Sequence, residues 1–342
     1  MSARRLQSFG FVIALLCALV PQPARSLGRD EPFIRRPYPD TMGGAWTGRG
    51  VAYGMHRDGQ RPGGKSPSRA QIAEDLDLIA QHWSTLRIYG TLEPAGTVLD
   101  VIAKQHPAMG VVLGVWIDPE VDSTGGVVRE RPEAVKANRA QIDAAVKLAA
   151  RYPAIVRAIA VGNETQVAWS NHRVAPSRLI EAIRELRVRT REPLTTAHDY
   201  NFWNKPESQI IARECDFLMV HAHPLWNGQS VETAIPWTEA RLAEIRALHP
   251  DAPLVLGETG WATQRTDTGD EAKYMKAPSD EATQAAFMAV LEAWLVTRPL
   301  PVFVFEAFDE NWKGGDKPDE VEKHWGLYRA DRTAKPAVAH TR

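Results

Sequence analysis

The feature that most constrains this chain is a regular alternation between short apolar runs and longer segments with helical periodicity. The apolar runs, most of them rich in valine, leucine and isoleucine, number eight: 50–54, 85–89, 110–117, 155–161, 194–198, 217–221, 254–257 and 302–305. Helical periodicity is clearest over residues 68–81, 132–151, 177–190, 232–248 and 280–297. Apolar strands that alternate with amphipathic helices indicate a parallel sheet whose outer face is covered by helices.

Eight such units predict an α/β fold, a single (β/α)8 TIM barrel, rather than an open doubly wound sheet. The glycine-rich turn of dinucleotide-binding domains does not follow the first strand, and the sequence contains no phosphate-binding loop. We expect the barrel domain to cover residues 49–342 and to be preceded by an irregular lead-in over residues 27–48.

Residues 1–26 have the pattern of a secretory signal peptide. Two arginines precede the apolar run 11–20, which is too short to span a bilayer because a spanning helix needs about 20 apolar residues. Ala24 and Ser26 supply the small residues of a cleavage site after Ser26. We therefore expect an exported protein, periplasmic or secreted, with no membrane attachment in its mature form.

The charge balance argues against a nucleic-acid partner. The chain has 41 basic and 42 acidic residues, so it has no basic excess to neutralise phosphates. Cys17 would leave with the signal peptide, and the mature chain, which keeps only Cys215, could form no intramolecular disulfide. We expect a monomer that is stabilised by a large apolar core.

Polar residues gather where the predicted strands end, and the carboxyl ends of barrel strands carry the chemistry. The fourth strand ends in Asn163 and Glu164, and the seventh ends in Glu258. Two carboxylates across a barrel mouth suit a glycosidase, in which one protonates the leaving oxygen and the other attacks the anomeric carbon. Asn163 is placed to hold the sugar 2-hydroxyl. A lone strand-end glutamate is as often a salt-bridge partner, but the two together favour catalysis.

Several motifs resemble glycoside hydrolase family 17, a family of retaining (β/α)8 enzymes that act on β-1,3-glucans, and they are most similar to its bacterial members. They cover nearly the whole barrel: Gly50-Val-Ala-Tyr-Gly-Met55, Arg87-Ile-Tyr89, Val161-Gly-Asn-Glu164, Gly257-Glu-Thr-Gly-Trp261, Phe305-Glu-Ala-Phe-Asp-Glu-Asn-Trp-Lys313 and His324-Trp-Gly-Leu327.

The resemblance implies that Glu164 is the proton donor and Glu258 the nucleophile, which forms a covalent glycosyl intermediate. The resemblance also implies that the protein needs no cofactor and that its substrate is a β-glucan oligosaccharide or polysaccharide. The resemblance, taken together with the positions of polar and aromatic residues at the strand ends, predicts the substrate-binding residues Tyr53, Arg87, Asn163, His223, Trp261, Glu306, Asp309, Glu310, Trp312 and Lys313.

The sixth strand departs from the plant members of the family. His223 takes the place of a tyrosine that orients the nucleophile, and we expect it to hydrogen-bond to Glu258 or to substrate. His221 and His223 also have the spacing of two metal ligands on one strand face, which leaves a metal-dependent barrel hydrolase as an alternative. Such hydrolases generally carry this motif on the first strand, and supporting ligands are not evident here.

The chain contains 11 tryptophans, whose apolar faces suit sugar rings as well as cores. We expect Trp261 to form the floor of the −1 sugar site and Trp325 to be structural. Other tryptophans on strand-end loops are candidates for acceptor-side stacking: Trp169, Trp203, Trp226 and Trp312.

Hydrolase and glucanosyltransferase activities share all of these residues, because they differ in whether water or a sugar hydroxyl reaches the intermediate. A catalytically silent, lectin-like glucan-binding barrel is a further alternative, which the presence of both carboxylates disfavours.

Overall fold

The computed structural model describes residues 33–341 apart from 43–44, 47, 123–127 and 299. The predicted signal peptide, residues 1–26, lies outside the described residues. Eight parallel strands close into a barrel: β3 (Arg49–Ala52), β4 (Thr85–Ile88), β5 (Gly110–Val115), β8 (Val156–Asn163), β9 (Leu194–Asp199), β10 (Leu218–His221), β11 (Leu254–Thr259) and β12 (Val302–Val304). Each coincides with one apolar run, and the predicted (β/α)8 barrel is confirmed.

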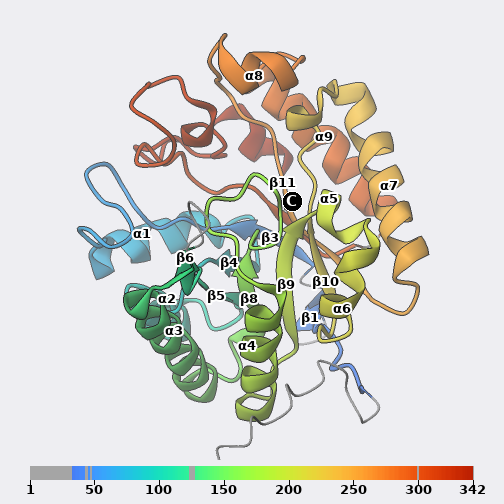
Figure 1. Ribbon diagram of the computed structural model, residues 1–342. Coiled ribbons are helices and arrows are strands. Elements are labelled where there is room, and N and C mark those ends of the chain that lie inside the picture. Colours follow the sequence, from blue (N-terminus) through green and yellow to red (C-terminus); the bar gives the residue numbers. More distant parts are fainter. Residues whose placement is uncertain (1–32, 43–44, 47, 123–127, 299, 342) are drawn as a thin grey trace, which may run out of the picture. The chain divides into compact units, whose positions relative to one another are not determined.

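Helices lie on the outside of the barrel (Figure 1). The longer ones are α1 (Arg69–Ile79), α2 (Ala95–Gln105), α3 (Pro132–Arg151), α4 (Pro176–Arg189), α7 (Val231–Leu248) and α9 (Glu281–Thr297). The short ones are α5 (Tyr200–Trp203), α6 (Gln209–Ala212), α8 (Gly269–Tyr274) and the 3-10 turns η2 (Pro206–Ser208), η3 (Leu225–Asn227), η4 (Val321–Lys323) and η5 (Pro336–His340). In the part of the chain that the structure describes, no helix is long and apolar enough to cross a membrane.

Local signals explain where most of the predicted helices begin. Ser68 caps α1, since its hydroxyl accepts from the backbone N of Gln71 while the Gln71 side chain bonds back to Ser68 N. Helices α3 and α4 begin with proline, which is suited to the first helical position. Helix α2, which the sequence analysis did not predict, has no side-chain cap.

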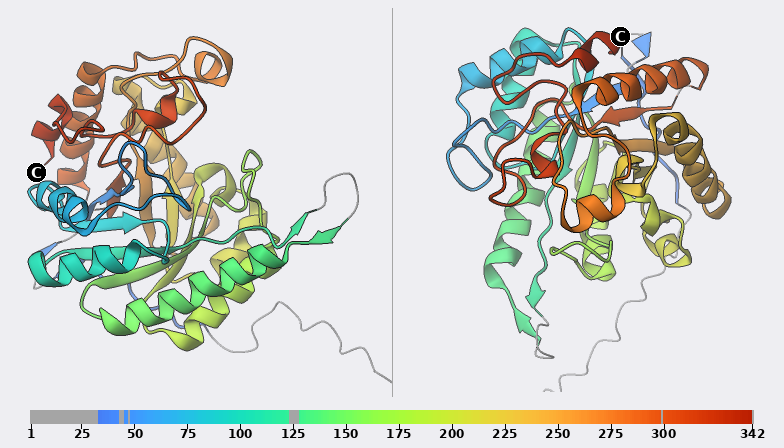
Figure 2. Two further views of the ribbon diagram at one scale, coloured as in Figure 1. Left: turned by 90° about the vertical axis from the view of Figure 1, so that its left-hand side faces the viewer. Right: turned by 90° about the horizontal axis from the view of Figure 1, so that it is seen from above.

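Two short antiparallel ribbons lie outside the barrel: β1 (Thr41–Met42) with β2 (Ala45–Trp46), and β6 (Val121–Asp122) with β7 (Arg129–Glu130). The β6–β7 ribbon follows β5 and projects away from the barrel (Figure 2). The β1–β2 ribbon falls in the lead-in that we expected to be irregular. Earlier in this lead-in, the ring of Tyr38 packs 4.9 Å from that of Phe217, so the segment covers the amino-terminal end of the barrel interior.

Apolar side chains form two layers of core. The larger layer lies between strands and helices, and a smaller cluster fills the barrel interior: Val112, Ala158, Ala160, Ala197, Phe217, Met219, Val255 and Phe303. Strand β10 shows how alternation divides them, because Leu218 and Val220 belong to the outer layer and Met219 to the interior. His221 comes next on the inner side, where polar side chains replace the apolar filling.

Candidate active site

The strands that carry Glu164 and Glu258 are both irregular just before these residues. The pairing of β11 with β10 shifts so that His221 lies opposite Glu258. In β8 the pairing with β9 shifts between Ala160 and Asn163. A bulge re-aims the side chains that follow it, and these two bulges set the directions of the two glutamates. Glu164 itself has a φ of 51°, which is uncommon for a residue with a side chain.

Glu258 is 7% exposed and is surrounded by hydrogen-bond donors. Its Oε1 accepts from Nη1 of Arg87 at 2.8 Å and from the Tyr89 hydroxyl at 2.8 Å. Its Oε2 lies 3.3 Å from Nε2 of His223. The structure thus places His223 beside Glu258.

These neighbours decide the charge of Glu258. Burial by itself would raise the pKa of Glu258, because a buried carboxylate loses its hydration. His221, Arg87 and the hydrogen bond from His223 outweigh that effect and hold the pKa of Glu258 well below its ordinary value. Burial would likewise lower the pKa of His223, but Glu258 raises it. Glu258 is therefore ionised at neutral pH.

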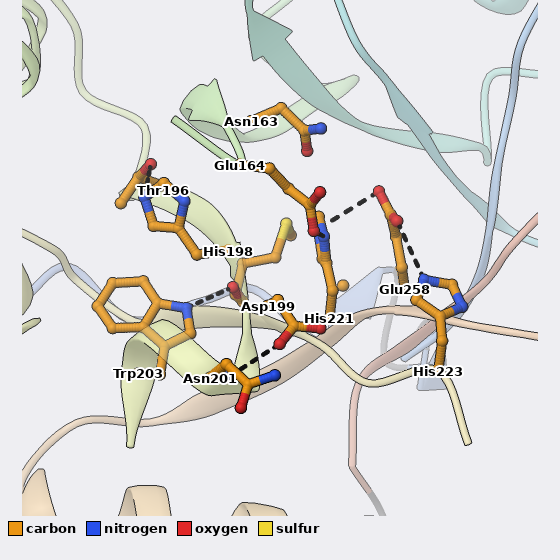
Figure 3. A network of polar contacts seen from close by, with 12 residues as sticks. Asn163, Glu164, Thr196, His198, Asp199, Asn201, Trp203, His221, His223 and Glu258 are labelled. Atoms are coloured by element: carbon orange, nitrogen blue, oxygen red, sulfur yellow. Dashed lines mark hydrogen bonds and ion pairs between the residues drawn. The ribbon is translucent and has the colours of Figure 1, made fainter. Parts of the chain in front are cut away.

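His221 lies between the two glutamates (Figure 3). Its Nδ1 is 2.9 Å from Oε1 of Glu164, and its Nε2 is 3.3 Å from Oε1 of Glu258. The His221 side chain is fully buried, the Glu258 side chain is 9% exposed and that of Glu164 is 26% exposed. Of the two carboxylates, Glu164 is thus the one more open to solvent.

Arg87 joins the ends of three strands beneath this pair. Its Nη2 donates to Oδ1 of Asn163 at 2.6 Å, and its Nη1 donates to the carbonyl of Gly257 at 2.8 Å. Arg87 is only 2% exposed. This corrects the prediction that Arg87 binds substrate, since its guanidinium is used up by Glu258, Asn163 and the backbone.

After β12, Lys313 lies between two buried glutamates. Its Nζ is 2.6 Å from both carboxylate oxygens of Glu306 and 2.8 Å from Oε2 of Glu310. Burial raises the pKa of Glu306 well above its ordinary value, although the charge of Lys313 opposes this effect. At Glu310, burial would also raise the pKa, but the charge and hydrogen bond of Lys313 outweigh it, so the pKa of Glu310 is lowered. The side chain of Lys313 is 16% exposed, and Trp312, which donates to Glu310, is 39% exposed. Of these four residues, Trp312 and Lys313 are the more exposed, and both glutamates are buried.

Two predicted substrate-binding residues point away from the pair of glutamates. The buried hydroxyl of Tyr53 donates to Asp75 of α1 at 3.0 Å, on the outer side of the barrel wall. Asp309 is 2.8 Å from Nζ of Lys335 and accepts from the backbone N of Gly326. Both predictions are therefore corrected to structural roles.

Trp261 does not form the floor of a sugar site, and Trp325, which is also 1% exposed, is the one of the two that packs against a site residue. Trp261 is 1% exposed, its ring packs 5.3 Å from that of Phe287 in α9, and its indole N donates to a backbone carbonyl, so it belongs to the core. The Trp325 ring lies 5.1 Å from that of His223 and 5.8 Å from that of Phe305, directly behind the site.

The other loop tryptophans differ in exposure. Trp203 is fully buried and donates to the carbonyl of Met219, so it cannot stack on a sugar. Trp226 is half-buried, and Trp169 is 60% exposed.

Tyr89, Asp199 and Glu322 also lie at the site, and the sequence analysis assigned no role to Tyr89 or Glu322. Tyr89 bonds to Glu258 and follows Arg87 by two positions, so strand alternation could have indicated it. Asp199 ends β9, where burial, with Glu164 adding to its effect, raises the pKa of Asp199 to about 7. Glu322, in η4, also has its pKa raised to about 7, chiefly by burial and against the influence of Lys313. No strand-end signal marks Glu322, because it follows the last strand by a long loop.

The ring nitrogens of His221 have protein partners that conflict with a metal site. Nε2 is 2.9 Å from Nη1 of Arg87, so a cation already occupies the side from which a metal would bind. Among the described residues, no group of three or more His, Cys, Asp or Glu side chains is arranged to hold a metal ion.

A cavity of about 540 Å³ lies elsewhere, lined in part by Arg49, Trp83 and Met109. These residues stand at the amino-terminal ends of β3, β4 and β5, the opposite end of the strands from Glu164 and Glu258. The cavity therefore has no part in the site.

An eight-stranded barrel with a glutamate at the end of its fourth strand and an ionised glutamate at the end of its seventh is the arrangement of a glycoside hydrolase. The BtgE/BtgC glycoside hydrolase domain matches residues 50–326, and the chain belongs to this family.

Similar proteins and similar solved structures support this family assignment. A glucan 1,3-β-glucosidase of Arthroderma benhamiae is 29% identical over 294 residues, which are 81% of this chain and 86% of that protein. An endo-laminarinase from Formosa Hel1_33_131 is 26% identical, with a TM-score of 0.73 over 84% of this chain and 85% of its own. The glycoside hydrolase family 17 β-1,3-glucanosyltransferase of Rhizomucor miehei, 22% identical, shares the fold with a TM-score of 0.64 over 84% of this chain and 95% of its own. The resemblance to family 17 is confirmed.

Proposed function

We propose that the protein is a retaining enzyme that cleaves or transfers β-1,3-linked glucosyl units, with Glu258 as nucleophile and Glu164 as acid and base. The observation that carries this proposal is that Glu164 and an ionised Glu258 contact the same buried ring, that of His221. The glucosidase of Arthroderma benhamiae and the Formosa endo-laminarinase support a β-1,3-glucan as substrate.

In the first step, a carboxylate oxygen of Glu258 attacks the anomeric carbon while Glu164 gives its proton to the leaving glycosidic oxygen. The bond from the anomeric carbon to the leaving oxygen breaks, and an ester bond to Glu258 forms. Arg87 and Tyr89 hold Glu258 in place for this attack, because both donate to its Oε1.

In the second step, Glu164 is the base. It takes a proton from water or from a sugar hydroxyl, whose oxygen attacks the anomeric carbon and releases Glu258 as a carboxylate. Water yields hydrolysis and a sugar hydroxyl yields transfer.

The remaining polar groups suit the sugar. Since Arg87 donates to Oδ1 of Asn163, the Nδ2 group of Asn163 is directed to a sugar hydroxyl. Glu322 offers a carboxyl group near His223 and Glu258. Trp312 presents a partly exposed ring for stacking.

Trapping of the intermediate tests this mechanism. A 2-deoxy-2-fluoroglucosyl donor with a fluoride leaving group slows both steps but the second more, so the ester should accumulate. We expect peptide mass spectrometry to find one label per chain, on Glu258, and Glu258→Gln to remain unlabelled. A label on Glu306 or Glu310, or turnover without any label, would contradict the assignment.

Product analysis separates hydrolysis from transfer. Laminari-oligosaccharides at high concentration should give products longer than the donor if a sugar hydroxyl is the acceptor. Products that are all shorter than the donor would establish hydrolysis.

We also propose that the protein is exported, with cleavage after Ser26, on the basis of the signal-peptide pattern in residues 1–26. Amino-terminal sequencing of the mature protein should begin at Leu27, and an intact residue 1 would contradict this proposal.

A further inference from the structure

His221 holds a position that the proposed mechanism does not yet use. Its ring is fully buried and lies within hydrogen-bond distance of Glu164 on one side and of Arg87 on the other. The proposed chemistry assigns proton transfer to Glu164 and attack to Glu258, and no step so far requires the imidazole between them.

The neighbours of His221 place a proton on Nδ1. Nε2 lies 2.9 Å from Nη1 of Arg87, which also donates to the carbonyl of Gly257 and to Glu258, and 3.3 Å from Oε1 of Glu258. The contact of Nδ1 is with Oε1 of Glu164, 2.9 Å away. A carboxylate oxygen accepts, so an Nδ1–H group donates to Glu164 when Glu164 is ionised.

The geometry points to His221 as a positioning residue for the second half of the reaction, in which its Nδ1–H group holds ionised Glu164 as the base. This inference rests on the proposed function, since it requires Glu164 to alternate between acid and base. Arg87 contacts His221 and binds Glu258 with the same nitrogen atom. One guanidinium thus fixes both the nucleophile and the residue that holds the base.

The position of the negative charge indicates in which half of the reaction His221 acts. Before the first step the charge is on Glu258 and the proton is on Glu164. When the ester forms, Glu258 loses its charge and Glu164, having given its proton away, gains one. A hydrogen bond from Nδ1–H is stronger to an ionised than to a neutral carboxyl group. His221 therefore contributes most while the ester awaits its acceptor.

Amide variants of His221 can separate the contributions of its two ring nitrogens. An asparagine side chain places its amide near the position of Nδ1, so His221→Asn keeps a donor for Glu164. A glutamine side chain reaches the position of Nε2, so His221→Gln is a matched control that keeps an amide but moves it. His221→Ala removes both contacts.

A donor with a dinitrophenyl leaving group isolates the second step, because such a group departs without protonation. Wild-type enzyme should release a burst of one dinitrophenolate per site and then turn over at the rate of ester breakdown. We expect His221→Ala to keep the burst amplitude and to lower the subsequent steady rate by about 10- to 100-fold, the loss typical of a hydrogen bond to a charged group. His221→Asn should regain most of the steady rate, and His221→Gln should not.

Azide supplies the second readout, because it attacks the ester without a base. Added azide should restore the steady rate of His221→Ala and yield a β-glucosyl azide. A burst whose rate falls as much as the steady rate, a loss that azide does not restore, or equal rates for His221→Asn and His221→Gln would overturn the inference. The absence of a burst in the wild type, with no 2-fluoroglucosyl label on Glu258, would instead refute the proposed function, and the inference would fall with it.

Discussion

At the scale of single residues, Arg87 organises the site. Its two terminal nitrogens reach Glu258, Asn163 and His221, which come from three different strands. The planar fork of a guanidinium can serve such divergent partners at once, which the single ammonium of a lysine cannot do. Because Arg87 is buried, its charge also lowers the pKa of Glu258 with little screening by water.

Glu164→Gln tests the proton donor. We expect this variant to lose most of its activity on laminari-oligosaccharides, whose leaving oxygen must be protonated. The first step with a dinitrophenyl donor should be affected far less, because that leaving group needs no proton. Rates of both donors measured side by side check the expectation, and equal losses on the two would remove Glu164 as the acid.

Trp325 and Trp261 offer a matched pair of replacements by phenylalanine. Trp325→Phe should lower kcat on the order of tenfold, because its ring supports His223 and Phe305, and His223 contacts Glu258. Trp261→Phe should instead lower the thermal midpoint, since it loses its hydrogen bond and its packing on Phe287 in the core. Kinetics and thermal unfolding of both variants test this, and the reverse pattern would restore Trp261 to the sugar site.

At the scale of elements, the irregular ends of β8 and β11 matter more than their regular parts. Gly257 lies where β11 departs from regular pairing, and a Cβ there would meet Cγ of Met219 at 2.2 Å. The absence of a side chain lets β11 lie close to β10, so that Glu258 comes opposite His221.

Gly257→Ala is therefore expected to lower kcat and to destabilise the protein by about 1–3 kcal/mol through overpacking. Met219→Ala should cost about 2–5 kcal/mol alone by leaving a cavity. The double variant should be more stable than the sum of the two losses predicts, because the new methyl group would fill part of that cavity. Urea unfolding of the three variants gives the comparison, and additive losses would show that Met219 does not obstruct position 257.

The strands of the barrel could be predicted from the sequence because each one is buried on both faces and forms a distinct run. Helix α2 could not, since it lacks a capping side chain and its start carries no signal. The bulges could not be predicted either, because register depends on how a neighbouring strand pairs; only Gly162 and Gly257 marked their places.

The candidate site was predictable where a strand ends in a carboxylate, as at Glu164 and Glu258. It was not predictable where the role of a residue depends on the direction in which its side chain points. Tyr53 follows the end of β3 as Glu164 follows the end of β8, yet it shares the outer face with Val51 two positions earlier, and that alternation was the missed signal. Asp309 lies beyond the last strand, where alternation no longer applies.

At the scale of the whole molecule, the site carries acidic groups whose burial works against folding at high pH. Asp199 is 7% exposed, and its pKa is raised to about 7, chiefly by burial. In the unfolded chain the pKa of an aspartate is about 3.9. Between these two values the folded protein binds a proton that the unfolded chain has lost, so stability falls as the pH rises through this interval.

Asp199→Asn should remove this dependence. The asparagine keeps the oxygen that accepts from the backbone N of Asn201, but it carries no charge to bury. We expect equal thermal midpoints for the variant and the wild type near pH 4, where the aspartate costs little in either state. The variant should become the more stable protein as the pH rises, by about 3–4 kcal/mol once the pH exceeds 7, and the difference should then stay constant. Thermal unfolding of both proteins from pH 4 to pH 9 measures it. A difference that is the same at every pH, or that shrinks as the pH rises, would mean that folding ionises Asp199 at little cost.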